Sequence, residues 1–238
     1  MRVAGVIRVF LALAVSIAGV FGGFSESRGE DGKGIFAEKC ARCHKISGPP
    51  AQTFEERKNR QGPDLTGAGS KFQKGWVEGW LQEPATIRPA GVMFLNHVKP
   101  GGKNDVVDQT TLPPHMALSA EEAKVVAQYL MTLTDQRVAH GMVEVGGKLT
   151  RFERNQGKSR FQKRFGCYAC HQIKDRRGRI VGGLSGPQLY DAGRRLQADW
   201  VYAFIKDPQA LDPKVWMPRR EFTDKDLQIL TKYIMSLK

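Results

Sequence analysis

Two stretches of the chain place apolar residues on one face of a helix, and they occupy matching positions in its two halves. Residues 119–133 and 223–237 repeat apolar residues at spacings of three, four and three, which predicts one buried helical face. Those apolar positions are Ala123, Val126, Leu130 and Leu133 in the first stretch, and Leu227, Leu230, Ile234 and Leu237 in the second. Each stretch begins with a helix cap: Ser119 with Glu122 forms a capping box, and Thr223 with Asp226 approximates one. We therefore expect the same amphipathic helix to close both halves.

An upstream block repeats as well, at a different offset. Residues 62–84 align without a gap with residues 186–208, and the shared residues include a Gly-Pro pair, a tryptophan and a closing proline. This alignment extends to Met93 and Met217, 124 positions apart, whereas the closing helices are 104 positions apart. The first half therefore carries a 20-residue insertion after Met93, at about residues 94–112, whose turn-rich "KPGGKND" predicts a loop.

The repeat defines the expected architecture. No strand pattern is persuasive in either half, so we predict an all-α fold of two tandem small helical domains, residues 30–137 and 158–238. Residues 138–157 between them are predicted to be a linker.

The N-terminus has the pattern of a targeting segment. An uncharged, largely apolar run at residues 9–24 follows Arg2 and Arg8. It is shorter than the about 20 residues that a membrane-spanning helix needs, so residues 1–25 are predicted to be a cleaved signal peptide, with a retained membrane anchor as the alternative. Either way, the rest of the chain is expected to be periplasmic or otherwise exported.

Export makes the four cysteines informative. They occur as "CARCH" at residues 40–44 and "CYACH" at residues 167–171, and none is left over. Cys-x-x-Cys-His is the attachment signature of c-type heme, because thiols one helical turn apart can form thioethers to both vinyl groups and the next histidine can ligate the iron. Zinc bound by four cysteines would not need a histidine after each pair, and a thioredoxin-like dithiol would need an α/β pattern that is missing.

With these motifs the chain resembles a diheme cytochrome c built from two class I cytochrome c domains. The resemblance rests on CxxCH, Gly-Pro-x-Leu, a Trp-containing helix ending in Pro, Met-Pro and a closing helix with Tyr, over residues 30–238. It implies two covalently bound heme c groups, each enclosed by a small helical bundle. The cysteines that would attach them are Cys40, Cys43, Cys167 and Cys170, and the implied axial ligands of iron are His44 in the first domain and His171 with Met217 in the second.

The second axial ligand in the first domain stays open. The upstream alignment favours Met93, because a loop inserted after a ligand leaves the ligand in place. The closing-helix alignment instead places Pro113, which cannot ligate, opposite Met217. Within "LPPHMALS", Met116 is the first rival and His115 a further one; His97 or an open site are the remaining alternatives.

The recurring residues near these ligands are expected to support them. The carbonyls of Pro63 and Pro187 are predicted to accept the ring N–H of the two proximal histidines, which would fix their orientation. Trp76 and Trp200 are predicted to pack the heme pockets. Arg194 and Arg195 are expected to be surface charges, with contact to a heme propionate as the alternative.

Charge separates the two halves. Residues 26–137 hold 15 Lys/Arg against 14 Asp/Glu, whereas residues 138–238 hold 20 against 10. A basic rim, including the run at residues 151–164, would steer redox proteins with acidic docking surfaces. A solvated face or attraction to an acidic membrane surface would explain the same charge, and no nucleic-acid partner is expected in this compartment.

The resemblance implies single-electron transfer between respiratory redox partners. The chain would act as a free carrier or as the electron-transfer subunit of a larger respiratory complex, a membrane-associated complex being one option. The alternative is a heme enzyme whose first heme is open or weakly ligated and acts on a small inorganic substrate.

Overall fold

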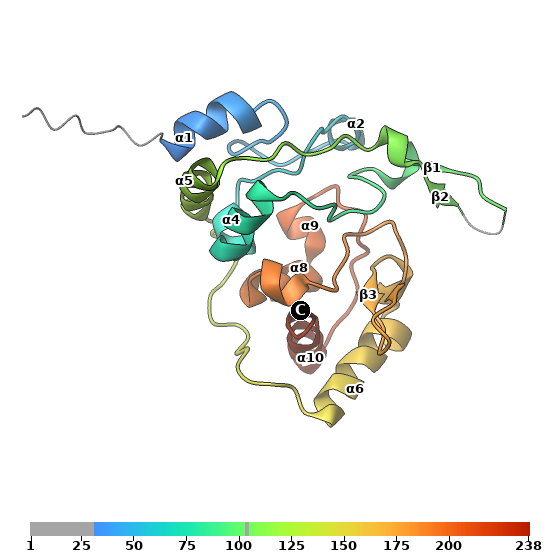
Figure 1. Ribbon diagram of the computed structural model, residues 1–238. Helices are drawn as coiled ribbons and strands as arrows, with labels where there is room; N and C mark the ends of the chain where they lie inside the picture. Colours follow the sequence, from blue (N-terminus) through green and yellow to red (C-terminus); the bar gives the residue numbers. More distant parts are fainter. Residues whose placement is uncertain (1–30, 103–104) are drawn as a thin grey trace, which may run out of the picture.

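The computed structural model describes residues 31–102 and 105–238 (Figure 1). The predicted signal or anchor segment, residues 1–25, lies outside the described residues. Within the described ranges, no helix is long and apolar enough to cross a membrane.

The first half is a small group of short helices closed by one longer helix. Its first helix, α1, continues directly into a π-helical turn, η1, that ends at Cys40, the first cysteine of the first Cys-x-x-Cys-His motif. The helices of this half are α1 (Gly32–Ile35), η1 (Phe36–Cys40), α2 (Phe54–Lys58), α3 (Ala68–Lys71), α4 (Lys74–Gln82), η2 (Phe94–Asn96), η3 (Gln109–Thr111) and α5 (Ala120–Met131).

The second half repeats this plan. Relative to the first half, α7 and α8 lie 124 residues after α3 and α4, and α10 lies 104 residues after α5, so the sequence repeat is also a structural repeat. The helices of this half are α6 (Arg151–Ser159), η4 (Arg160–Arg164), η5 (Cys167–Ala169), α7 (Ala192–Arg195), α8 (Ala198–Lys206), α9 (Pro208–Leu211) and α10 (Asp224–Met235).

In each half, the helix that leads to the heme motif crosses the closing helix at a glycine. A Cβ at Gly32 would lie 2.1 Å from the Val125 carbonyl oxygen in α5, and a Cβ at Gly157 would lie 2.4 Å from the Tyr233 Cβ in α10. Only glycine permits such close approach, so these crossings fix where each heme motif starts. Each half buries its own apolar core around its crossing, with Phe36 in the first and Phe161 in the second among the fully buried side chains.

The closing helix of the second half also carries a buried carboxylate. Asp226 is 2% exposed and accepts hydrogen bonds from Arg160 (2.8 Å), Arg164 (3.0 Å) and the Thr223 hydroxyl (2.8 Å). Burial opposes ionisation, but these hydrogen bonds outweigh it and lower the pKa of Asp226. This network ties η4 to α10 immediately before the second heme motif.

The secondary structure differs from the sequence predictions at two places. Helix α6 begins at Arg151, inside the predicted linker, because a complete capping box of Thr150 and Glu153 starts it there. Two short antiparallel hairpins also form, β1 (Val98–Lys99) with β2 (Val106–Val107), and β3 (Ile173–Lys174) with β4 (Ile180–Val181). The first hairpin lies within the predicted insertion.

The two halves meet along a reciprocal seam. Phe72 and Leu196 pair as an antiparallel bridge, the Gln73 amide N–H donates to the Arg195 carbonyl, and the Gln197 amide N–H donates to the Lys71 carbonyl, both at 2.9 Å. The two glutamine side chains bond across the same seam, Gln73 to the Leu196 carbonyl (3.0 Å) and Gln197 to the Phe72 carbonyl (2.8 Å). Each partner lies 124 residues from its counterpart, so equivalent surfaces of the two halves face each other.

Candidate heme sites

Both Cys-x-x-Cys-His motifs form a single helical turn. The Cys40 carbonyl accepts hydrogen bonds from the amides of Cys43 and His44, both at 3.0 Å. The Cys167 carbonyl does the same for Cys170 (3.2 Å) and His171 (3.0 Å). Two thiols and one imidazole therefore leave the same turn, as attachment to one edge of a porphyrin requires.

The ring of each motif histidine is oriented by a backbone carbonyl that binds its Nδ1 atom. His44 Nδ1 donates to the Pro63 carbonyl (2.9 Å), and His171 Nδ1 donates to the Pro187 carbonyl (2.8 Å). A carbonyl only accepts, so Nδ1 carries the proton and the Nε2 lone pair is free for a metal. Burial lowers the pKa of both rings, which keeps them neutral and able to ligate.

A glycine makes room for each of these rings. A Cβ at Gly62 would lie 2.6 Å from His44 Cε1, and a Cβ at Gly186 would lie 2.7 Å from His171 Cε1. The Gly-Pro pair of the sequence repeat therefore has two separate functions. The glycine leaves space for the imidazole, and the proline carbonyl holds it.

The cysteine thiols are better suited to forming thioether bonds than to binding a metal ion directly. All four cysteines are free. Burial raises the pKa of Cys40, and it raises the pKa of Cys167 to about 11, so these thiols are protonated and are poor zinc thiolates. Within residues 31–102 and 105–238, no three His, Cys, Asp or Glu side chains gather where they could hold a metal ion.

The methionines that are candidates for the second axial ligand of either iron lie in different surroundings. Met217 packs against the core of the second half, and its carbonyl accepts a hydrogen bond from Gln209 Nε2 (2.8 Å). Met93 is 5% exposed, and its neighbour Phe94 lines a hollow with Ala169 of the second heme motif. Met116, in contrast, is 46% exposed.

The two histidine candidates also differ from each other. The His115 ring centroid lies 5.9 Å from that of His44, with an angle of 51° between the ring planes. His97 Nδ1 is hydrogen-bonded to the Thr111 hydroxyl (2.9 Å), and Gly91 leaves room for its ring, since a Cβ there would lie 2.4 Å from His97 Cδ2.

A cluster of cations lies at the seam, and we call it the cationic cluster. Its members are Arg57, Arg60, Lys71, Arg88 and Arg195. Burial and the neighbouring arginines lower the pKa of Lys71 to about 7 and that of Arg88 to about 10. The expectation that Arg195 is a surface charge is wrong: it is 3% exposed, because the other half covers it, whereas Arg194 is exposed as expected.

The cationic cluster is not neutralised by the side chains that contact it. Among the described residues, its ion pairs are with Asp64, Asp191 and Asp212, three carboxylates for five cations. Buried Nε atoms of three of its arginines also lack a hydrogen-bond partner within those residues, namely Arg57, Arg60 and Arg195. The charges of Arg88 and Arg195 act on His171, so the cluster lies beside the second heme motif. Buried and partly buried arginines that outnumber their carboxylate partners, with unpaired N–H groups, are a fit for the carboxylates of heme.

The repeated tryptophans also contact the cationic cluster across the seam. Lys71 Nζ lies 4.7 Å from the ring of Trp200, and Arg195 Cζ lies 5.8 Å from the ring of Trp76. These cation–π contacts are reciprocal, since the members of each pair are 124 residues apart from their counterparts. Sequence reasoning missed Lys71 as a site residue, although a cation at equivalent positions of both repeats was a readable signal.

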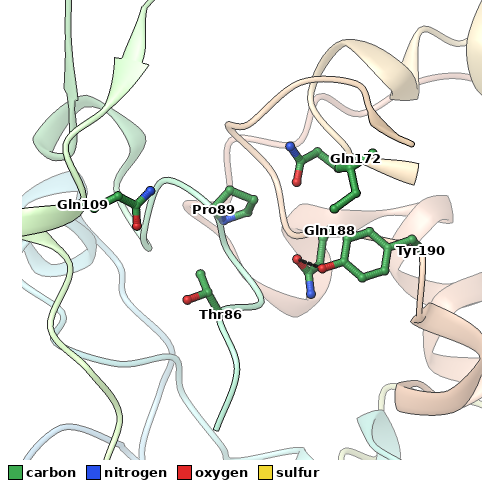
Figure 2. A pocket seen from close by; sticks show the side chains of 7 residues that line it. Thr86, Pro89, Gln109, Gln172, Gln188 and Tyr190 are labelled. Atoms are coloured by element: carbon green, nitrogen blue, oxygen red, sulfur yellow. Dashed lines mark hydrogen bonds between the residues drawn. The ribbon is translucent and has the colours of Figure 1, made fainter. Parts of the chain in front are cut away.

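A polar hollow follows the seam on the side of the second motif. In Figure 2, Thr86 and Pro89 of the first half face Gln188 and Tyr190 of the second, and the Tyr190 hydroxyl donates to Gln188 Oε1 (2.6 Å). Gln109 reaches the same hollow from the insertion. The insertion is therefore an interdomain element as well as a loop of the first half.

Two repeated helical halves, each with a Cys-x-x-Cys-His turn and a histidine held by a prolyl carbonyl, define a protein of two tandem helical domains with the residues that c-type heme attachment requires. The family model "Cytochrome c" matches residues 29–134 and 155–238. The chain belongs to the cytochrome c family, and this membership implies covalently bound heme c.

Comparisons with individual proteins add little to this. No curated protein matches the chain. A solved structure, the reducing HAO-like protein complex Kustc0457/Kustc0458 of Kuenenia stuttgartiensis, is 19% identical over 87% of this chain and 96% of that chain, with a TM-score of 0.32. A likeness at that TM-score carries no argument about fold or function.

Proposed function

We propose that the chain is an exported diheme cytochrome c that passes single electrons between respiratory redox partners. One heme c is attached to Cys40 and Cys43 with His44 as proximal ligand. The other is attached to Cys167 and Cys170, with His171 and Met217 as axial ligands. The chain acts as a carrier or as the electron-transfer subunit of a larger enzyme, on the outer side of the cytoplasmic membrane.

The duplication of one site geometry carries this proposal. Both motif histidines have a free Nε2, a prolyl carbonyl on Nδ1 and a glycine beside the ring. When bound, heme supplies a one-electron couple whose potential depends on axial ligands and surroundings. The chain's own residues attach it, orient its ligand and surround it with apolar side chains.

The cationic cluster gives the seam a role in this function. Its surplus cations are placed to pair with carboxylates of heme at the junction of the halves. Paired in this way, they would hold the carboxylates of the second heme toward the seam and favour passage of an electron from one half to the other.

The charge of the second half indicates the kind of partner. In the basic segment that precedes the second heme motif, Arg160 and Arg164 are engaged by Asp226, whereas Arg151, Arg154 and Lys163 are exposed without such a pair among the described residues. Exposed cations near a heme edge would attract a redox protein with an acidic docking surface. The rate of reaction with such a partner should fall as salt is raised.

The decisive test is the cofactor content and reactivity of the exported protein. Intact mass and the alkaline pyridine spectrum should report two hemes per chain, and a redox titration should resolve two one-electron steps. A double Cys40→Ala, Cys43→Ala variant should lose one heme and keep the other. A chain without covalent heme would end the proposal, and a heme that binds carbon monoxide in the native protein would favour the enzymatic alternative.

A further inference from the structure

We propose that His115 is the second axial ligand of the heme attached to the first motif. This heme would then be ligated by two histidines, His44 and His115, while the second heme keeps a histidine and a methionine. The proposal rests on the proposed function, in that it presumes heme at both motifs.

The separation of the two rings is the first argument. A metal–imidazole bond is about 2 Å long, and adding about 1 Å per ring gives roughly 6 Å between the centroids of two imidazoles on opposite sides of one metal. The observed centroid separation of His44 and His115 is 5.9 Å. The rings are therefore spaced as a shared iron requires.

The protonation of His115 is the second argument. Its Nδ1 lies 2.8 Å from the Met116 carbonyl oxygen, and a carbonyl only accepts, so Nδ1 carries the proton. The lone pair then resides on Nε2, as it does in His44 and His171. A backbone carbonyl on the far nitrogen is the usual partner of a metal-bound histidine, because it fixes the tautomer and makes the ring a stronger ligand.

The surrounding residues hold His115 in place. Its ring packs against the Trp80 indole at 4.6 Å between centroids, and Trp80 is itself fixed by its Nε1–H donating to the Ala85 carbonyl (2.8 Å). Three residues further on, the Leu118 amide N–H donates to the Leu81 carbonyl (2.9 Å), which anchors the loop to α4. The ring is thus positioned by α4 on one side and by the cap of α5 on the other.

The sequence repeat places His115 on the loop before the closing helix, the loop that carries Met217 in the second half. Counted from the capped starts of α5 and α10, Met217 corresponds to Pro113, and His115 lies two residues later. The same loop therefore supplies the distal ligand in both halves, with methionine in the second and histidine in the first.

The rival residues are less well placed. Met93 is in a segment that reaches the second heme motif through Phe94. His97 Nδ1 is hydrogen-bonded to the Thr111 hydroxyl, which can donate or accept and so does not fix the tautomer as a carbonyl does. Met116 accepts the His115 hydrogen bond with its carbonyl, and its side chain is largely exposed.

Unequal ligation would set the direction of electron flow. Histidine–methionine ligation raises the reduction potential of a heme relative to other ligand pairs. The heme of the first half would have the lower potential and that of the basic second half the higher. Electrons would enter through the first half and leave from the second.

Spectroscopy of the full-length ferric protein tests the assignment directly. Electron paramagnetic resonance and near-infrared magnetic circular dichroism should report one bis-imidazole heme and one histidine–methionine heme. Two histidine–methionine hemes, or a high-spin heme, would overturn the proposal. Heme content by mass is measured on the same sample, so that a missing heme counts against the proposed function and a wrong ligand only against this inference.

Variants then identify the residue. His115→Ala should convert one heme to a high-spin form that binds added imidazole and carbon monoxide, and should move only the lower of the two potentials. His115→Met should keep that heme low-spin and raise its potential. Met93→Ala, Met116→Ala and His97→Ala serve as matched controls and should leave both spectra unchanged. If one of them converts the heme and His115→Ala does not, the assignment is wrong.

Discussion

The crossing of α1 with α5 can be tested with one substitution at two positions. Gly32 and Gly34 lie two residues apart in the same short helix. A Cβ at Gly32 would meet the Val125 carbonyl oxygen at 2.1 Å, whereas a Cβ at Gly34 has nothing within 4 Å. Replacing each glycine by alanine therefore separates the effect of the crossing from the effect of helix propensity.

The expected difference follows from the structure. Ordinary contact begins at 3.4 Å, so Gly32→Ala must move α1 by about 1.3 Å from the backbone of α5. Overpacking of this kind costs about 1–3 kcal/mol. Gly34→Ala should instead stabilise by up to about 1 kcal/mol through helix propensity. The two variants should thus differ by about 1–4 kcal/mol in the free energy of unfolding, which is roughly 2–16 °C in Tm for a chain of this size.

The assay is thermal and urea unfolding of the heme-loaded protein, followed by circular dichroism. The yield of heme at the first motif is a second readout, because α1 leads directly to Cys40. If Gly32→Ala is as stable as Gly34→Ala, the crossing does not constrain this half, and the reasoning from close approach is refuted. Gly157→Ala, against the side chain of Tyr233, provides an independent repetition in the second half.

Three further predictions concern the site and the seam. Gly62→Ala should push the His44 ring off the Pro63 carbonyl and so make the ring a weaker ligand. The reduction potential of the first heme alone should rise by tens of millivolts, at about 59 mV per tenfold change in the ligand's affinity for ferric over ferrous iron, measured by redox titration. Asp212→Asn should leave the buried Arg57 charge unpaired and cost about 3 kcal/mol, the low end for a buried pair because Asp212 is partly exposed, measured by urea unfolding. Because its pKa is lowered in the folded protein, the Asp226 carboxylate contributes stability above the unfolded pKa of about 3.9, and this stability is lost as pH falls through the lowered pKa. Asp226→Asn should therefore weaken the dependence of the free energy of unfolding on pH in the acid range, measured by unfolding at a series of pH values.

Each of these changes has a matched control. Gly75→Ala in α4 adds a Cβ with nothing within 4 Å and should leave the potentials unchanged. Asp105→Asn and Glu144→Gln alter exposed carboxylates and should leave stability and its pH dependence nearly unchanged. Equal effects in a variant and its control would contradict the corresponding prediction.

Short sequence patterns predicted those features of the structure that form within one half of the chain. The apolar spacing and caps located the starts of α5 and α10 to the residue and their ends to within two residues, because both signals lie within a single segment. The Gly-Pro repeat likewise predicted the carbonyls that hold His44 and His171, and both hydrogen bonds are present in the structure. The capping box at Thr150 was equally readable and would have placed the start of α6 correctly.

What depends on contact between the halves could not be predicted in the same way. Arg195 has the pattern of a surface residue within its own half, and only the seam buries it. The distal position of the first heme was ambiguous because the insertion gives the repeat two offsets, and each offset selects a different residue. The structure adds a distance between side chains, 5.9 Å from His44 to His115, which neither alignment contains.

The reciprocal hydrogen bonds around Gln73 and Gln197 have a kinetic consequence. Two separate carriers must collide before they can exchange an electron, and their rate depends on concentration and on ionic strength. Two hemes held in one chain by a fixed junction, as proposed, would need no such encounter. Their exchange would be first-order and independent of protein concentration, so that only the arrival and departure of outside partners would be slow and sensitive to salt.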